Sequence, residues 1–154
     1  MFERNYLFNP FLLMTSTDEE LSDVINDLAQ KYRYTDMPYD IAFNINLESD
    51  VLIIYGELVA RYQGEIDHIK LEAENTRGEN LVKFRDEWKP KKEGEKMPAM
   101  SYFEALADKS VYELRQRQNT LHTMLTRFKN HYDSMETKQN ALKKKLEAVK
   151  FEAI

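Results

Sequence analysis

The stretch that decides the fold is VYELRQRQNTLHTMLTRFKNHYDSMETKQNALKKKLEAV, residues 111–149. Along it, mostly apolar or aromatic positions recur at alternating spacings of three and four residues, the heptad pattern of a helix packed lengthwise against another. Two of these positions are glutamines, which either specify register and oligomer state or have no such role. We call the whole set the C-terminal seam: Val111, Leu114, Gln118, Leu121, Leu125, Phe128, Tyr132, Met135, Gln139, Leu142, Leu146 and Val149.

The helix that carries this seam is predicted to begin near Ser101, where Glu104 completes a capping box, and to continue to about residue 152. So long a helix cannot belong to a compact globule of 154 residues. It must fold back on another helix of the chain, pack against copies of itself, or do both.

A second long helix is predicted from Asp50 to about Trp88, where Pro90 stops it. The connector to the C-terminal helix is short, which favours an antiparallel hairpin of the two long helices. The first helix also carries a heptad pattern, which fades toward its end: Leu52, Tyr55, Val59, Tyr62, Ile66, Ile69, Ala73 and Thr76.

The N-terminal region is predicted to hold a short amphipathic helix over residues 17–33, opened by a capping box of Thr17 and Glu20. In residues 34–49 apolar side chains alternate with mostly polar ones, which is typical of an extended segment. The predicted fold is therefore all-α, with an acidic N-terminal helix and extended arm in residues 1–49. A long helical hairpin with coiled-coil-like seams follows in residues 50–154.

Charge is distributed unevenly along a chain whose net charge is −5. Residues 1–60 carry 3 basic and 11 acidic side chains, whereas residues 111–154 carry 9 basic and 5 acidic ones. An acidic head and a basic tail favour different partners at the two ends, or head-to-tail assembly. Cysteine is absent, and no apolar run approaches the length that spans a bilayer, so an intracellular protein without membrane association is expected.

Motifs for catalysis and metal binding are nearly absent from the sequence. The three histidines, His68, His122 and His131, form no i, i+4 pair, and no phosphate-binding glycine loop or nucleophile elbow is present. We therefore expect a protein that is not an enzyme and that uses no cofactor or metal.

One stretch does carry a candidate function: LVKFRDEWKPKKEGEKMPAM, residues 81–100. One interpretation is a solvated, charged helix end. The other is a site for single-stranded nucleic acid, which requires cations for phosphates and aromatic faces for bases. We call the candidate residues the basic-aromatic cluster: Lys83, Arg85, Trp88, Lys89, Lys91 and Lys92.

The order of these segments resembles that of the UvsY-type recombination mediators of tailed phages. The local match is LVKFRDEW, residues 81–88, because that family carries a Lys-x-Arg pair followed by aromatic residues at the end of its first long helix. ALADKSVYEL near the start of the second long helix and the terminal KLEAVKFEA are also similar to the family. The chain departs from it in the lysine-rich KPKKEGEK, where a glycine-rich turn is expected.

The resemblance implies a non-enzymatic mediator in the cytoplasm of a bacterial host, active in DNA recombination and repair. It also implies that residues 50–154 serve for DNA binding and for oligomerisation into a homo-oligomeric ring. The expected partners of such a mediator are single-stranded DNA, a RecA-type recombinase, single-strand-binding protein and copies of itself in a ring of six or seven. The expected oligomer contacts are Leu114, Leu121, Leu125, Phe128, Tyr132, Met135, Leu142, Leu146 and Val149. The alternative is a coiled-coil structural protein, or an adaptor or inhibitor, of a phage that binds no nucleic acid.

Overall fold

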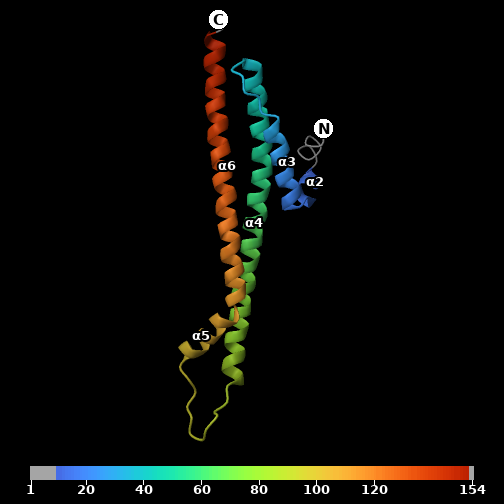
Figure 1. Cartoon of the computed structure of the whole chain (residues 1–154). Helices are drawn as coiled ribbons and strands as arrows, with labels where there is room; N and C mark the ends of the chain where they lie inside the picture. The colour runs from blue at the N-terminus through green and yellow to red at the C-terminus, as the bar shows by residue number, and fades with distance from the viewer. Residues whose placement is uncertain (1–9, 153–154) are drawn as a thin grey trace. The chain divides into compact units, whose positions relative to one another are not determined.

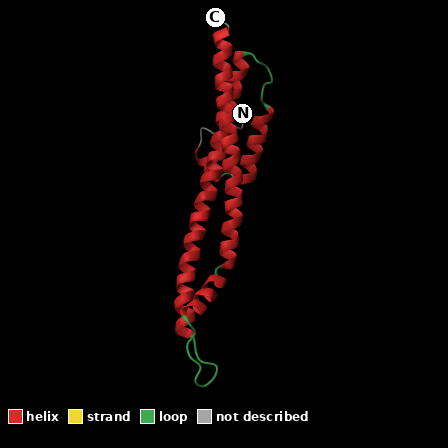
Figure 2. Ribbon diagram, turned by 90° about the vertical axis from the view of Figure 1, so that its left-hand side faces the viewer, coloured by secondary structure: helices red, strands yellow, loops and turns green. Residues whose placement is uncertain are grey.

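All the regular structure in the described part of the chain is helical (Figure 2). The computed structural model describes residues 10–152. The prediction of an all-α fold with two long helices packed together is confirmed (Figure 1). In chain order the helices are α2 (Pro10–Thr15), α3 (Asp18–Gln30), α4 (Pro38–Glu87), α5 (Met100–Ser110) and α6 (Tyr112–Glu152).

The chain divides into two compact units, and both long helices contribute to each. Unit 1 contains Met1–Arg61 and Leu125–Ile154, and unit 2 contains Tyr62–Met124. In unit 1 the Tyr55 ring stacks on His131 with centroids 5.5 Å apart, and Ser49, earlier in α4, is bonded by Gln139, later in α6. The two helices therefore run in opposite directions within this unit.

The core of unit 1 forms where the apolar face of α3 packs against α4. Thr17 caps α3, and its hydroxyl accepts a hydrogen bond from the backbone N–H of Glu20 at 3.1 Å, as the capping-box spacing predicts. The buried side chains recur three or four residues apart on both helices, which aligns each apolar stripe with the other. They are Leu21, Val24 and Leu28 from α3, and Leu47, Val51, Ile54 and Leu58 from α4.

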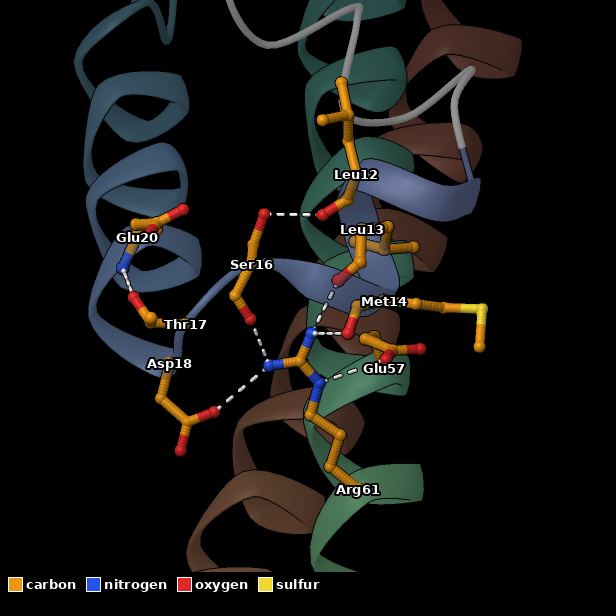
Figure 3. Close-up of polar contacts among 9 residues, drawn as sticks. All are labelled: Leu12, Leu13, Met14, Ser16, Thr17, Asp18, Glu20, Glu57 and Arg61. Carbon is orange, nitrogen blue, oxygen red and sulfur yellow. Dashed lines mark hydrogen bonds and ion pairs between the residues drawn. The ribbon is translucent and has the colours of Figure 1, made fainter.

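Arg61 ties the short helix α2 to α4 (Figure 3). Its guanidinium donates hydrogen bonds to the carbonyls of Leu13 at 2.6 Å, Met14 at 3.0 Å and Ser16 at 2.5 Å. It also pairs with the carboxylates of Asp18 at 3.3 Å and Glu57 at 3.0 Å. Because the last carbonyls of a helix have no partner within the helix, one arginine supplies the donors that the end of α2 needs.

Gln139 is a polar residue of the C-terminal seam that is 7% exposed. Its amide donates to the Ile45 carbonyl at 3.2 Å and to the Ser49 hydroxyl. Both partners lie on α4 of the same chain, so this amide helps to set the register of α6 along α4 in unit 1.

The extended arm predicted for residues 34–49 is wrong from Pro38 onward, because α4 begins there. Proline suits the first position of a helix, where its missing N–H costs nothing. The Asn44 side chain stabilises the turn before α4 through two hydrogen bonds to the backbone of Arg33. Its oxygen accepts from the Arg33 N–H at 2.8 Å, and its amide donates to the Arg33 carbonyl at 2.6 Å.

The single helix predicted from Ser101 is also wrong in two details. The helix begins at Met100 after Ala99, whose side chain makes no capping bond, so the predicted capping box of Ser101 and Glu104 does not form. It is then interrupted at Val111, which has φ −107° and ψ 13° and separates α5 from α6. Next to the break the Ser110 hydroxyl donates to the Ala107 carbonyl at 2.6 Å, a bond that competes with the helical pattern.

Observed burial agrees with the C-terminal seam at every position, but with the predicted heptad positions of α4 only in part. Every position of the C-terminal seam is buried or half-buried in the chain. On α4 the predicted positions from Ile66 to Ala73 are buried, but before them Leu52 and Val59 are only half-buried, while Val51 and Leu58 are buried. The buried stripe is displaced by one residue there because α4 packs against α3 as well as α6 in unit 1.

Candidate nucleic-acid interface

The basic-aromatic cluster lies where α4 ends in unit 2. The last turn of α4 carries Arg85, with Lys83 just before it, and the helix stops at Glu87, shortly before Pro90. The backbone N–H of Trp88 donates to the Arg85 carbonyl at 3.4 Å, which closes the final turn. The cluster is therefore half helix end and half connector.

The connector of residues 88–99 has a defined turn at its centre. The Glu95 carboxylate accepts from the backbone N–H groups of Lys91 at 2.7 Å and Lys92 at 3.3 Å, and the Glu95 N–H donates to the Lys92 carbonyl at 3.2 Å. Gly94 has φ +82°, a left-handed conformation that glycine adopts without steric cost. The turn leaves the side chains of Lys91 and Lys92 exposed.

All five cations of the cluster are exposed, and Trp88 is half-buried. Lys83 and Arg85 are two residues apart on a helix, so their side chains leave it about 200° apart. A single flat contact cannot engage both. A strand that reaches both must pass around the end of α4.

The cations of the cluster differ from several other basic side chains in having few acidic partners. Arg85 lies 3.7 Å from Asp86, and no acidic side chain among the described residues pairs with the four lysines. Elsewhere, basic residues of α6 are engaged within their own unit. They form the pairs Arg117–Glu65, Lys138–Glu48 and Lys145–Asp36.

Polar contacts that the sequence did not reveal hold α5 against α4 in unit 2. Arg77 pairs with Asp108, which raises the pKa of the arginine above its ordinary value, and the Asn80 amide donates to the Ser110 hydroxyl at 2.9 Å. Phe103 of α5 is 2% exposed. These contacts anchor the helix that follows the connector. Neither pair falls at a spacing that a sequence pattern reveals, because each joins residues about thirty apart.

The nine predicted oligomer contacts all lie on α6, at positions of the C-terminal seam that follow the break at Val111. Leu125 is the one among them that the chain buries, at 4% exposed, and the other eight are half-buried. They are Leu114, Leu121, Phe128, Tyr132, Met135, Leu142, Leu146 and Val149.

Within residues 10–152, no helix has the length and apolar content needed to cross a membrane. The same residues contain no group of three or more His, Asp or Glu side chains placed to hold a metal ion.

Comparison with known proteins identified no relative of this chain. No protein-family model, no curated protein and no solved structure matched it. A function for this chain must therefore be argued from its own residues.

Proposed function

We propose that the chain is a non-enzymatic recombination mediator that binds single-stranded DNA. It would assist the loading of a RecA-type recombinase onto strands coated with single-strand-binding protein. The observation that carries the proposal is the basic-aromatic cluster, in which five exposed cations flank a half-buried indole in the sequence and four of them have no acidic partner among the described residues. Such a combination meets both requirements of single-strand binding, charge for phosphates and an aromatic face for bases.

In this mechanism the phosphates of a strand contact Lys83 and Arg85 near the C-terminal end of α4. The lysines of the connector extend the contact along the backbone, and Trp88 stacks on a base. Phosphate contacts carry no sequence information, so binding is expected to be sequence-tolerant and strongly dependent on salt.

The proposal includes a homo-oligomer, a ring of six or seven copies. The half-buried side chains of the C-terminal seam support it, since one chain leaves part of this apolar surface in contact with water. In a ring, the weak cluster of each copy acts on one strand, and the combined affinity exceeds that of a single cluster through effective concentration.

The test is a titration of labelled oligo-dT at several salt concentrations. The double variant Lys83→Ala, Arg85→Ala should bind more weakly, and the magnitude of its slope of log K against log salt should fall by about 1.4, since each single-strand phosphate contact contributes about 0.7. The matched control is Lys143→Ala, Lys144→Ala, which removes two exposed cations from α6 and should leave the slope unchanged. An unchanged slope in the first variant and a reduced slope in the control would place the phosphate contacts on α6 instead.

A second candidate is a coiled-coil structural protein, adaptor or inhibitor that binds no nucleic acid. It is favoured by the acidic side chains among the cations: residues 83–96 contain six basic and four acidic residues, and one of the acids, Glu95, organises the connector. This candidate predicts a stable oligomer that fails to bind oligo-dT even at low salt. Salt-dependent binding would exclude it.

A further inference from the structure

An open hollow of about 730 Å³ lies in unit 2 where α5 ends and α6 begins. Lys109, Ser110, Tyr112 and Leu114 are among the residues that line it. Its volume is within the range of sites for small organic groups, so a nucleobase can enter it. The basic-aromatic cluster belongs to the same unit.

The hollow lies close to Lys83 of the basic-aromatic cluster. The Asn80 amide of α4 donates to the Ser110 hydroxyl at 2.9 Å, and Ser110 lines the hollow. Lys83 follows Asn80 by three residues, and side chains at this spacing are neighbours on a helix. A strand held at Lys83 therefore has to extend by about one helical turn, roughly 5 Å, to reach the wall of the hollow at Ser110.

Two exposed tyrosines lie on either side of Lys109 in the sequence. Tyr102 and Lys109 are seven residues apart, so they share a face of α5, two turns from each other. Tyr102 is 51% exposed, and Tyr112, at the start of α6, is 62% exposed. We call Tyr102, Lys109 and Tyr112 the aromatic track.

The acidic residues of α5 lie away from the face that carries Tyr102. Glu104 and Asp108 follow Tyr102 by two and six residues, so both leave the helix more than about 100° from it. Asp108 is also paired with Arg77 of α4. A phosphate on the face of Tyr102 therefore does not meet these carboxylates directly.

Among the charged side chains that line the hollow, Lys109 is the one suited to a phosphate. Arg117 is already paired with Glu65 at 2.8 Å, and Glu113 is acidic. Lys109 is exposed and has no acidic partner among residues 10–152. A cation between two exposed aromatic rings matches the needs of a single strand, whose phosphates alternate with bases that stack.

We propose that the aromatic track is a second stretch of the single-strand path, with bases stacked on Tyr112 and Tyr102 and a phosphate between them on Lys109. This inference rests on the proposed DNA binding and extends it from the end of α4 onto α5. Aromatic rings stack on any base, so the track adds affinity without adding sequence preference. Because stacking releases no counterions, this part of the affinity persists at high salt.

The experiment measures the binding of labelled oligo-dT to the full chain at low and at high salt. Tyr102→Ala and Tyr112→Ala should each lower the affinity about fivefold or more, and the loss should persist at high salt. Tyr102→Phe and Tyr112→Phe keep the ring and should bind like the wild type. The matched control is Tyr34→Ala, because Tyr34 is a tyrosine of unit 1 that is 91% exposed.

Lys109 is tested through the salt dependence of binding. Lys109→Ala should reduce the magnitude of the slope of log K against log salt by about 0.7, the contribution of one single-strand phosphate contact. Lys144→Ala removes an exposed cation of unit 1 and should leave the slope unchanged. Equal slopes for Lys109→Ala and the wild type would remove Lys109 from the path.

Failure of the track and failure of the proposed function give different results. Wild-type affinity in both tyrosine-to-alanine variants, together with a reduced slope in Lys83→Ala, Arg85→Ala, would overturn the track and leave the cluster in place. No binding of oligo-dT by the wild type would overturn both. Equal losses in Tyr112→Ala and Tyr34→Ala would also overturn the track.

Folding is controlled separately for Tyr102. Its ring contacts the buried Phe103 ring, with centroids 5.4 Å apart, so the alanine variant removes a packing contact as well as a stacking face. Should Tyr102→Ala fail to fold, the comparison of Tyr112→Ala with Tyr112→Phe still decides the proposal. Equal affinities of these two variants would overturn it.

Discussion

At the scale of the residue, Arg61 has the most concentrated set of contacts described here. It serves three backbone carbonyls and two carboxylates with one planar group, which no other side chain type can do. We predict that Arg61→Ala lowers the free energy of unfolding by about 1–3 kcal/mol, because it leaves these acceptors without their donor. Calorimetric melting measures the loss, and faster amide hydrogen exchange in residues 11–16 locates it at α2.

The control for this prediction is Arg77→Ala, another arginine of α4. Arg77 has a single ion pair with Asp108 at the surface, where solvent screens it, so its loss should lower the melting temperature much less than the loss of Arg61 does. The melting temperature of Arg61→Lys should be closer to that of Arg61→Ala than to that of the wild type. A lysine ammonium cannot reproduce the planar, forked set of N–H donors of the guanidinium. An equal melting temperature for Arg61→Ala and Arg77→Ala would show that α2 does not depend on Arg61.

Trp88 is the residue at which the two interpretations of the basic-aromatic cluster separate. A half-buried indole can stack on a base, which contributes about 1–3 kcal/mol per base, or cap the packed helices. We predict that oligo-dT quenches the fluorescence of Trp88, the only tryptophan in the chain, and that Trp88→Ala loses binding with little change in melting temperature. A large drop in melting temperature without any quenching would mean that the indole belongs to the core.

At the scale of the element, the start of α4 is predicted to respond to acid. Asp40 lies in its first turn, where the Thr35 hydroxyl and then the Arg33 guanidinium donate to its carboxylate and lower its pKa below the ordinary value. A carboxyl whose pKa is lowered by folding contributes stability above its unfolded pKa and loses it as the pH falls through the folded pKa. The stabilisation by Asp40 should therefore be complete at neutral pH and lost in strong acid.

The measurement is the melting temperature of the wild type and of Asp40→Asn from neutral pH down into strong acid. The variant should melt lower at neutral pH, and the two curves should converge below the ordinary pKa of aspartate, near 4. A difference that stays constant across this range would mean that the charge of Asp40 does not contribute.

The elements show how far the sequence alone predicts this fold. The C-terminal seam was predicted position by position, because α6 buries one narrow stripe and nearly all of that stripe is apolar. The start of α4 was missed for the opposite reason. Its buried face includes the polar residues Asn44 and Glu48, each 3% exposed, so the helical period was hidden and only a strand-like alternation of apolar residues was visible.

The candidate sites differ in the same way. The basic-aromatic cluster is contiguous in sequence, so its residues could be named before the structure was known. The cavity in unit 1 that is lined by residues of α3, α4 and α6, Glu48 among them, could not be predicted, because its α3 and α6 walls lie more than a hundred residues apart in the sequence. Nothing in the sequence marks Glu48 as buried, since an isolated glutamate is most simply a solvated side chain.

At the scale of the whole molecule, the prediction concerns assembly. We expect light scattering to show a homo-oligomer larger than a dimer at micromolar concentration. Leu142→Glu should dissociate it, because a charge on the half-buried C-terminal seam cannot be desolvated in an interface without a partner. Lys144→Glu, an exposed position on the same helix, is the matched control and should leave the assembly intact. A monodisperse wild-type monomer would contradict both the assembly and the ring mechanism.

The connector of residues 88–99 has a consequence for how the molecule can be divided. A single protease cut there would produce an N-terminal piece with α2 to α4 and a C-terminal piece with α5 and α6. Each compact unit takes residues from both pieces, so neither piece contains a complete unit. Cleavage should therefore leave a nicked protein that stays together, and the two pieces expressed separately should each be poorly folded yet regain helical structure on mixing. The chain is thus suited to use as a split protein, whose reassembly reports that its two halves have met.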